Sequence, residues 1–264
     1  MKRDVIRYKL TTVKGMGRWV KICEMDRALW FDDFAFKRGG KGVNDEKLDN
    51  NISRARTSVR ELAMCNEWQW FATFTLNKDK QDRYNLDAFH KKLAKFISDQ
   101  NRRRPPEKKI TYILVPEKHK DGAWHMHGLM GGLEKSDLYR NKFGYYGWKG
   151  YERSFGFLSI GRIKDPDAVI GYVCKYVTKT LAKDISAANA HLYYRSRGLK
   201  EPELIFRELG APVYGGKWDY EHPDGFCRLA TVRADRAAGQ VSHESQEAAK
   251  AAFLEALEGY APMP

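Results

Sequence analysis

Hydrophobic residues recur along the chain with two different periods, and these periods predict alternating helices and strands. Apolar positions three and four residues apart predict an amphipathic helix over residues 45–66. Strict alternation of apolar and polar residues over 68–77 predicts a strand with one buried face. The helical period returns over 86–101, just before two prolines that end the helix.

A hairpin and a third helix are predicted further along the chain. Two strands are expected over 109–117 and 123–130, joined by a turn at Asp121-Gly122. A helix is expected to start at Asp165-Pro166 and to run without a break to about Lys183, because proline is favoured in a first helical turn.

Two histidines on the second strand of this hairpin are the first sign of chemistry. Residues two apart on a strand point the same way, so His125 and His127 share a face, while Trp124 and Met126 occupy the other. Two neutral imidazoles on one rigid surface can hold a divalent metal ion. An ordinary pair of hairpin histidines is the alternative.

Glu117, at the end of the preceding strand, is a candidate third ligand. A two-residue turn places it opposite Met126, on the wrong face. One extra residue in the turn, with Gly122 in the left-handed conformation, places it opposite His127, and this is the register that we predict. His119 shares the strand parity of Glu117 and is a second candidate. Carboxylate and water ligands favour Mg²⁺ or Mn²⁺ with open positions for a phosphate oxygen.

Two tyrosines and two lysines form a second candidate motif in the predicted helix. Tyr172 and Tyr176 lie about 40° apart around a helix, and Lys175 and Lys179 share that side. A tyrosine oxygen can attack a phosphodiester to give a 5′-phosphotyrosine and a free 3′-hydroxyl. A lysine beside the phenol favours its ionised form or neutralises the developing charge. An amphipathic helix with tyrosines at the core edge is the alternative.

Composition agrees with a nucleic-acid partner. The chain has 47 Lys and Arg against 34 Asp and Glu, a net charge of +13, which favours binding to a polyanion. The four cysteines form no CxxC pair, so we expect reduced and mostly buried thiols. We find neither an apolar run of about 18 residues nor a GxxxxGK[ST] phosphate loop, so we expect no membrane span and no attached helicase.

The three motifs together resemble those of a known superfamily. The strand Phe71–Leu76, the triplet His125-Met126-His127 and the pair Tyr172-x-x-x-Tyr176 with its lysines resemble the ordered motifs of HUH endonucleases. The likeness is greatest to two-tyrosine rolling-circle replication initiators of small single-stranded DNA phages, plasmids and integrated elements. It covers about residues 68–183.

The resemblance implies an α+β fold, in which helices flank a central antiparallel sheet of about five strands. It implies that His125 and His127 bind the metal, with Glu117 as third ligand by analogy, and that Tyr172 or Tyr176 is the nucleophile. The first motif implies a DNA contact or a structural role for Thr73 and Thr75.

The implied domain organisation has four parts. Residues 1–66 are expected to form an N-terminal extension of short strands plus the helix 45–66, and residues 67–185 the catalytic domain. Residues 186–233 are expected to form a C-terminal extension packed on that domain, and residues 234–264 an Ala- and Glu-rich tail.

Single-stranded origin DNA is the expected substrate, and a host helicase and DNA polymerase are the expected partners, in the cytoplasm of a bacterial host. A basic cluster beside the predicted sheet is expected to contact DNA phosphates. Its members are Arg102, Arg103, Arg104, Lys108 and Lys109.

Two other functions remain open at the level of sequence. One is a single-tyrosine HUH transposase or relaxase-like strand transferase, in which one phenol suffices for every step. The other is a non-catalytic nucleic-acid-binding module, which would bind DNA without forming a covalent adduct.

Overall fold

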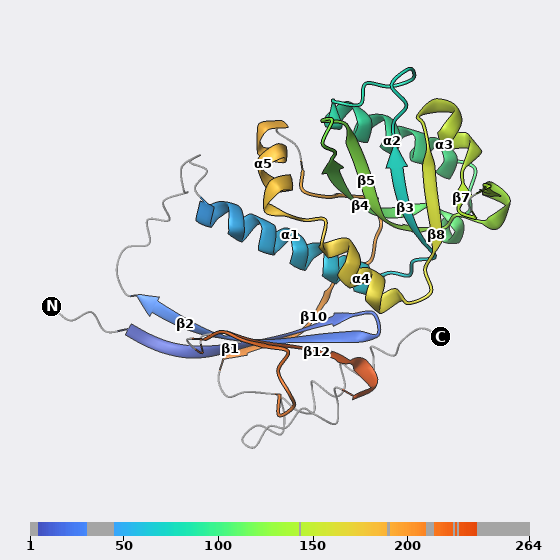
Figure 1. Cartoon of the computed structure of the whole chain (residues 1–264). Helices are drawn as coiled ribbons and strands as arrows, with labels where there is room; N and C mark the ends of the chain where they lie inside the picture. Colours follow the sequence, from blue (N-terminus) through green and yellow to red (C-terminus); the bar gives the residue numbers. More distant parts are fainter. Residues whose placement is uncertain are drawn as a thin grey trace. The chain divides into compact units, whose positions relative to one another are not determined.

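The computed structural model describes residues 5–30, 45–142, 144–188, 191–209, 214–223, 225 and 227–236. The chain divides into two compact units (Figure 1). The central unit comprises residues 43–200, and the terminal unit comprises residues 1–42 together with 201–264. Each unit is described by itself.

An antiparallel sheet forms the middle of the central unit. Its described strands follow the order β6-β7-β8-β3-β5-β4-β9, and every neighbouring pair is antiparallel. The strands are β3 (Trp70–Thr75), β4 (Thr111–Lys118), β5 (Trp124–Gly131), β6 (Tyr139–Arg140), β7 (Tyr146–Gly147), β8 (Leu158–Arg162) and β9 (Tyr194–Arg195). The predicted α+β fold with a central antiparallel sheet is confirmed. The described sheet has seven strands because β6, β7 and β9 add two residues each at its edges.

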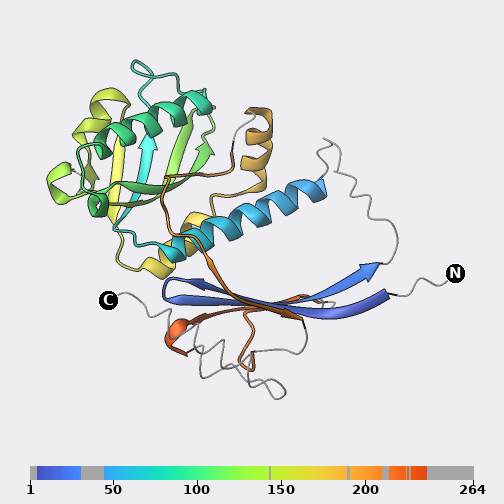
Figure 2. The same ribbon diagram turned by 180° about the vertical axis from the view of Figure 1, so that it is seen from behind.

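Helices cover both faces of this sheet. They are α1 (Asp45–Cys65), α2 (Leu86–Asn101), α3 (Lys149–Ser154), α4 (Pro166–Cys174) and α5 (Lys179–Ala188). Helix α2 lies behind the sheet in Figure 1 and in front of it in Figure 2. Phe74 of β3 packs on Tyr151 of α3, with ring centroids 5.2 Å apart, whereas Phe71 faces the other way and packs on Tyr172 of α4 at 5.3 Å. The alternation along β3 therefore separates the core face from the face that carries the histidines.

Helix α2 has the bounds that its sequence pattern predicts. The Asn85 side chain accepts a hydrogen bond from the backbone N–H of Ala88 at 2.9 Å, which caps the first turn. Leu86, Phe89, Leu93 and Ile97 form its buried stripe. Local signals fix both ends of this helix, so the prediction is confirmed here.

The hairpin β4–β5 has the predicted left-handed glycine but a different register. Gly122 has φ +84°, and the backbone N–H of His119 bonds to Ala123 O at 2.9 Å. The three-residue loop is thus 120–122, which places Glu117 opposite His125 and not opposite His127 as predicted. The extra loop residue comes from the β4 side, because Lys120 leaves the strand. Glu117 still faces the same side of the sheet as the two histidines.

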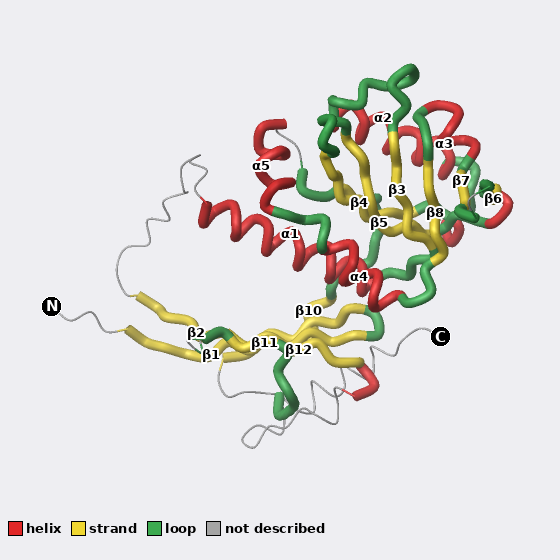
Figure 3. Tube along the Cα trace, in the orientation of Figure 1, coloured by secondary structure: helices red, strands yellow, loops and turns green. Residues whose placement is uncertain are grey.

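The continuous helix predicted from 165 to 183 is wrong, because it breaks after Cys174. Figure 3 shows the loop between α4 and α5. The backbone N–H groups of Tyr176 and Val177 bond to carbonyls three residues back, at 3.2 and 3.3 Å, so the last turn is tightened. Thr178 Oγ1 then accepts from the Leu181 N–H at 3.1 Å and starts α5 as a cap. Arg56 Nε donates to the Val177 carbonyl at 2.8 Å, which satisfies a group exposed by the break.

The terminal unit contains its own five-stranded antiparallel sheet in the order β10-β1-β2-β12-β11. The strands are β1 (Val5–Met16), β2 (Trp19–Trp30), β10 (Glu203–Leu209), β11 (Tyr220–Glu221) and β12 (Cys227–Arg233). Its small core contains Val13, Val20, Ile22, Tyr214 and Ala230. The predicted short N-terminal strands are instead two strands of 12 residues each.

This division of the chain differs from the predicted one. Helix α1 belongs to the central unit, and the strands after residue 200 pair with those at the N-terminus. Of the predicted tail, residues 237–264 lie outside the described part of the chain.

All four cysteines are free thiols, and Cys65 is buried whereas Cys23, Cys174 and Cys227 are half-buried. The prediction of reduced thiols is confirmed, although the burial is less complete than expected. None of the described helices is long and apolar enough to cross a membrane.

Candidate active site

Two threonines and two histidines pair across neighbouring strands of the central sheet. In the β3–β5 register, Thr73 lies opposite His127 and Thr75 lies opposite His125. The Oγ1 atoms are 3.0 Å and 3.2 Å from the respective Nδ1 atoms. Each hydroxyl thus engages one ring nitrogen and leaves the Nε2 atom on the far side of the ring.

Glu117 approaches His127 although its strand partner is His125. Its Oε2 atom lies 2.8 Å from Nε2 of His127, and the Glu117 side chain is 45% exposed. The Nε2 atom is buried and makes no hydrogen bond of regular geometry, because the carboxylate does not lie along the N–H direction. The contact is therefore a close ionic approach to a nitrogen whose hydrogen-bonding capacity is unused.

Four aromatic rings form a row along this face. The ring centroids of His119 and His125 are 3.7 Å apart, those of His125 and His127 are 6.5 Å apart, and those of His127 and Tyr176 are 4.4 Å apart. All three pairs are stacked within 15° of parallel. His119, a second candidate ligand from its strand parity, is a stacking partner of His125.

The electrostatics of the row keep both imidazoles neutral. Burial, with the neighbouring His119 and His127, lowers the pKa of His125 to about 4. Burial also lowers the pKa of His127, although Glu117 opposes that shift. A neutral imidazole has a free lone pair, which is the state that a metal ligand requires.

The donor chemistry of these residues suits a divalent cation, but the donors do not converge. Among the described residues, no group of three His, Cys, Asp or Glu is close enough to hold a metal ion. The unused Nε2 of His127 and the adjacent carboxylate are suitable ligands, whereas the ring of His125 lies parallel to that of His127. Coordination by all three residues would need rotation of their side chains.

The two tyrosines meet at their hydroxyl groups. Tyr172 is in α4 and Tyr176 is in the turn after it, and their oxygens are 2.8 Å apart with the rings perpendicular. Tyr172 is 45% exposed and packs on Phe71 of β3. The fold therefore brings all three sequence motifs to one face of the sheet.

The phenol of Tyr176 is held in its protonated form. Burial raises its pKa most, followed by the hydrogen bond and charge of Tyr172 and then by the charge of Glu117. The predicted effect of a lysine on the phenol stays a prediction. Lys175 is exposed, and the side chain of Lys179 lies outside the described part of the chain.

Residues 69–181 match the family model of the ORF2-type replication-associated proteins. This stretch, called the matched segment below, runs from β3 to the start of α5 and contains both threonines, both histidines, Glu117 and both tyrosines. The predicted resemblance to a replication initiator is confirmed at the level of a replication-associated family. No curated protein and no solved structure matches the chain.

The predicted basic cluster does not lie next to the tyrosines of the matched segment. The cluster precedes β4, whose first residue, Thr111, pairs with Gly131 at one end of the hairpin. Glu117 and His125 pair six residues along, so the two places are about 20 Å apart at about 3.4 Å per residue. The structure therefore does not bring the cluster and the histidines together.

Several charges of this cluster are also already paired. Arg104 is 14% exposed, donates to the Gly132 carbonyl at 3.0 Å and forms an ion pair with Asp137 at 2.5 Å. Lys108 lies 2.9 Å from Glu134, and Arg102 lies 3.5 Å from Asp99. Arg103 and Lys109 are exposed.

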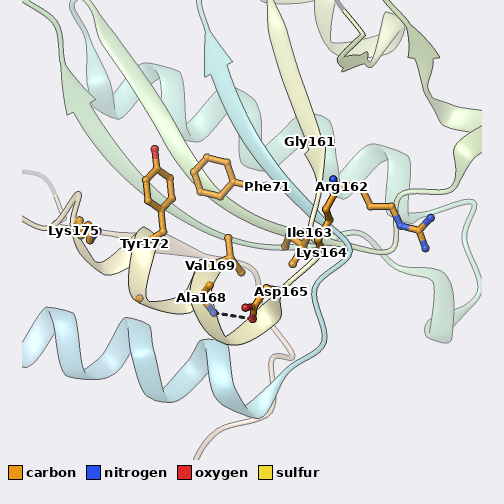
Figure 4. A pocket seen from close by; sticks show the side chains of 11 residues that line it. Phe71, Gly161, Arg162, Ile163, Lys164, Asp165, Ala168, Val169, Tyr172 and Lys175 are labelled. Atoms are coloured by element: carbon orange, nitrogen blue, oxygen red, sulfur yellow. Dashed lines mark hydrogen bonds between the residues drawn. The ribbon is translucent and has the colours of Figure 1, made fainter.

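Sequence reasoning missed a pocket of about 620 Å³ beside Tyr172 (Figure 4). It lies between the end of β8 and helix α4, and its wall includes Arg162 and Lys164. The signal in the sequence was the alternation Arg162-Ile163-Lys164 directly before the predicted helix, which was not connected to the tyrosines.

Proposed function

We propose that the chain initiates rolling-circle replication by nicking single-stranded origin DNA through tyrosine attack. One observation supports this most directly. The ring of Tyr176 stacks on His127, while its hydroxyl meets that of Tyr172 at 2.8 Å. Two nucleophiles thus stand beside a neutral imidazole and a carboxylate, within a segment that matches a replication-associated family.

The reaction balances with the groups present. The Tyr176 oxygen forms a new bond to phosphorus, the bond from phosphorus to the 3′ oxygen breaks, and the phenol proton ends on the departing 3′ oxygen. The products are a 5′-phosphotyrosine and a free 3′-hydroxyl. The reverse attack by a 3′-hydroxyl rejoins the strand. Lys175 and Lys179 are proposed to neutralise charge on the phosphate.

His125, His127 and Glu117 would hold a divalent cation, Mg²⁺ or Mn²⁺, which withdraws charge from the scissile phosphate when bound. Thr73 and Thr75 hold the Nδ1 atoms, so that the Nε2 atoms stay available. We infer that Tyr176 attacks first, because it stacks on His127 and feels the charge of Glu117. Tyr172 then stands within reach of the same phosphate for a second transfer.

The partners follow from the products. A free 3′-hydroxyl is a primer for a DNA polymerase, and duplex unwinding needs a helicase, so both are proposed to come from the host. Arg103 and Lys109, which are exposed, are the members of the basic cluster best able to contact DNA outside the nick.

The test uses a labelled pool of single-stranded oligonucleotides incubated with the full chain and Mn²⁺. We expect a covalent DNA–protein adduct that survives denaturing electrophoresis and is abolished by EDTA. The double variant Tyr172→Phe with Tyr176→Phe should give no adduct, whereas Tyr84→Phe, another exposed tyrosine, should leave it unchanged. An adduct formed by the double variant contradicts the proposal.

A further inference from the structure

The pocket beside Tyr172 has a wall that suits a planar ligand. The aromatic rings of Phe71 and Tyr172 stand side by side above Val169 in Figure 4. Ile163 and Ala168 complete the apolar part of the lining. A largely apolar pocket of about 620 Å³ with a few polar groups at its rim lies within the size range of small-ligand sites.

Positive charge surrounds this apolar wall. Arg162 and Lys175 lie at opposite ends of the pocket in Figure 4, and Lys164 is a further cationic lining residue. All three are exposed. Asp165 is the one acidic lining residue, and its Oδ1 atom already accepts from the N–H groups of Asp167 and Ala168, at 3.0 Å each. The net charge at the rim therefore favours an anionic ligand.

Two glycines leave open space in the lining. A Cβ atom added to Gly161 of β8 or Gly171 of α4 would have no neighbour within 4 Å, and neither residue has a positive φ. Either position therefore accepts a side chain without backbone strain. A large side chain at Gly171 would fill the pocket from its helix wall.

We propose that this pocket is a nucleotide subsite of the matched segment, a proposal that rests on the proposed function. It receives the base of a nucleotide next to the scissile linkage, packed on the rings of Phe71 and Tyr172. The phosphate of that nucleotide lies against Arg162 and Lys164. Stacking on aromatic side chains accepts any base, and cationic side chains hold the backbone. The subsite thereby directs the strand past Tyr172 to Tyr176.

The first test measures binding without chemistry. The full chain is titrated, in EDTA, against a fluorescein-labelled 30-nucleotide single strand of random sequence and against an abasic strand of the same length. Gly171→Leu should weaken binding to the base-bearing strand by roughly tenfold, the value expected for loss of one stacked base. It should leave binding to the abasic strand unchanged. Ser98→Leu, on an exposed position of α2, is the matched control and should bind both strands like the wild type.

The second test separates phosphate from base contacts. Arg162→Ala and Lys164→Ala should each lower the slope of log affinity against log salt concentration by about 0.7, as expected for one phosphate contact to a single strand. Gly171→Leu should not change this slope. Lys95→Ala, an exposed lysine of α2, is the control and should leave it unchanged.

The outcomes distinguish this proposal from the proposed function. Wild-type affinity in both Gly171→Leu and Lys164→Ala overturns the subsite, even where the covalent adduct forms. An equal loss on the abasic strand also overturns it, because the pocket would then hold backbone and no base. If no adduct forms with any strand but the base-dependent loss is observed, the nicking function is wrong and the subsite stands.

Discussion

At the residue scale, the hydroxyls of Thr73 and Thr75 set the state of the two histidines. A hydroxyl that accepts from Nδ1–H fixes the tautomer in which Nε2 carries the lone pair. The sequence predicted that His125 and His127 share a face, because strand parity is a local property. It could not predict their pairing with the threonines, because that depends on the register between β3 and β5, which lie about fifty residues apart.

Thr73→Val tests this role, since it removes the hydroxyl and nearly preserves the shape. We expect the Mn²⁺ concentration needed for half-maximal adduct formation to rise by roughly tenfold or more, because partners of metal ligands typically have such effects. Thr73→Ser should restore the wild-type value. Thr57→Val, on the exposed side of α1, should have no effect. An unchanged Mn²⁺ dependence in Thr73→Val contradicts the role.

His90 gives the central unit a predictable pH dependence. Burial lowers the pKa of His90 below its ordinary value of 6.5, and its ring stacks on Tyr194 with centroids 3.9 Å apart. The unfolded chain therefore takes up a proton near pH 6.5 before the folded chain does. The associated stability is complete above pH 6.5 and is lost as the pH falls below it.

The variant His90→Phe should flatten this dependence, because phenylalanine keeps the stack and does not titrate. The measurement is the free energy of unfolding between pH 5 and pH 7, where the wild type should lose more stability on acidification than the variant. Part of the slope should persist, since His125 and His127 also have lowered pKa values. Identical slopes in the two proteins would mean that His90 does not contribute.

At the scale of the element, the turn between α4 and α5 decides where Tyr176 lies. Apolar residues continue at helical spacing through this turn, so the periodicity alone predicted one unbroken helix. Thr178 was the overlooked signal, because a threonine whose hydroxyl caps the third following residue starts a new helix. The two phenols still meet, because the tightened last turn keeps Tyr176 beside Tyr172. The ends of α2 were predictable because their caps coincide with the limits of its apolar stripe.

Thr178→Ala should therefore destabilise the central unit by about 1 kcal/mol, the usual effect of losing an N-terminal cap. The free energy of unfolding in denaturant measures it. Thr180→Ala, at an exposed position two residues later in α5, is the matched control and should change stability little. Equal stability in the two variants contradicts the capping role. Adduct formation should also slow in Thr178→Ala, because the turn that positions Tyr176 loses support.

At the scale of the whole molecule, the chain builds its terminal unit from its two ends. Strands β10 and β12 pair with β1 and β2 across more than 170 residues, and no local pattern announces such pairing. This is why sequence reasoning placed both ends as extensions of the central domain. Inside this unit, Glu24 is 3% exposed and forms an ion pair with Arg228 across β2 and β12.

Arg228→Met should destabilise the terminal unit by roughly 2 to 3 kcal/mol, because it leaves a buried carboxylate without its partner. Hydrogen exchange should accelerate in β1, β2 and β12 while β3, β4 and β5 keep their protection. Arg233→Met, which removes an exposed ion pair with Asp235, should change little. Faster exchange throughout both sheets would contradict the independence of the two units.

The central claim is tested most directly by mapping the covalent linkage. The full chain is reacted with single-stranded DNA and Mn²⁺, digested with nuclease and protease, and analysed by mass spectrometry. We predict a 5′-phosphonucleotide on Tyr176 in the wild type, and on Tyr172 in the Tyr176→Phe variant. A linkage to any residue other than these two tyrosines, or cleavage without a linkage, would contradict the account.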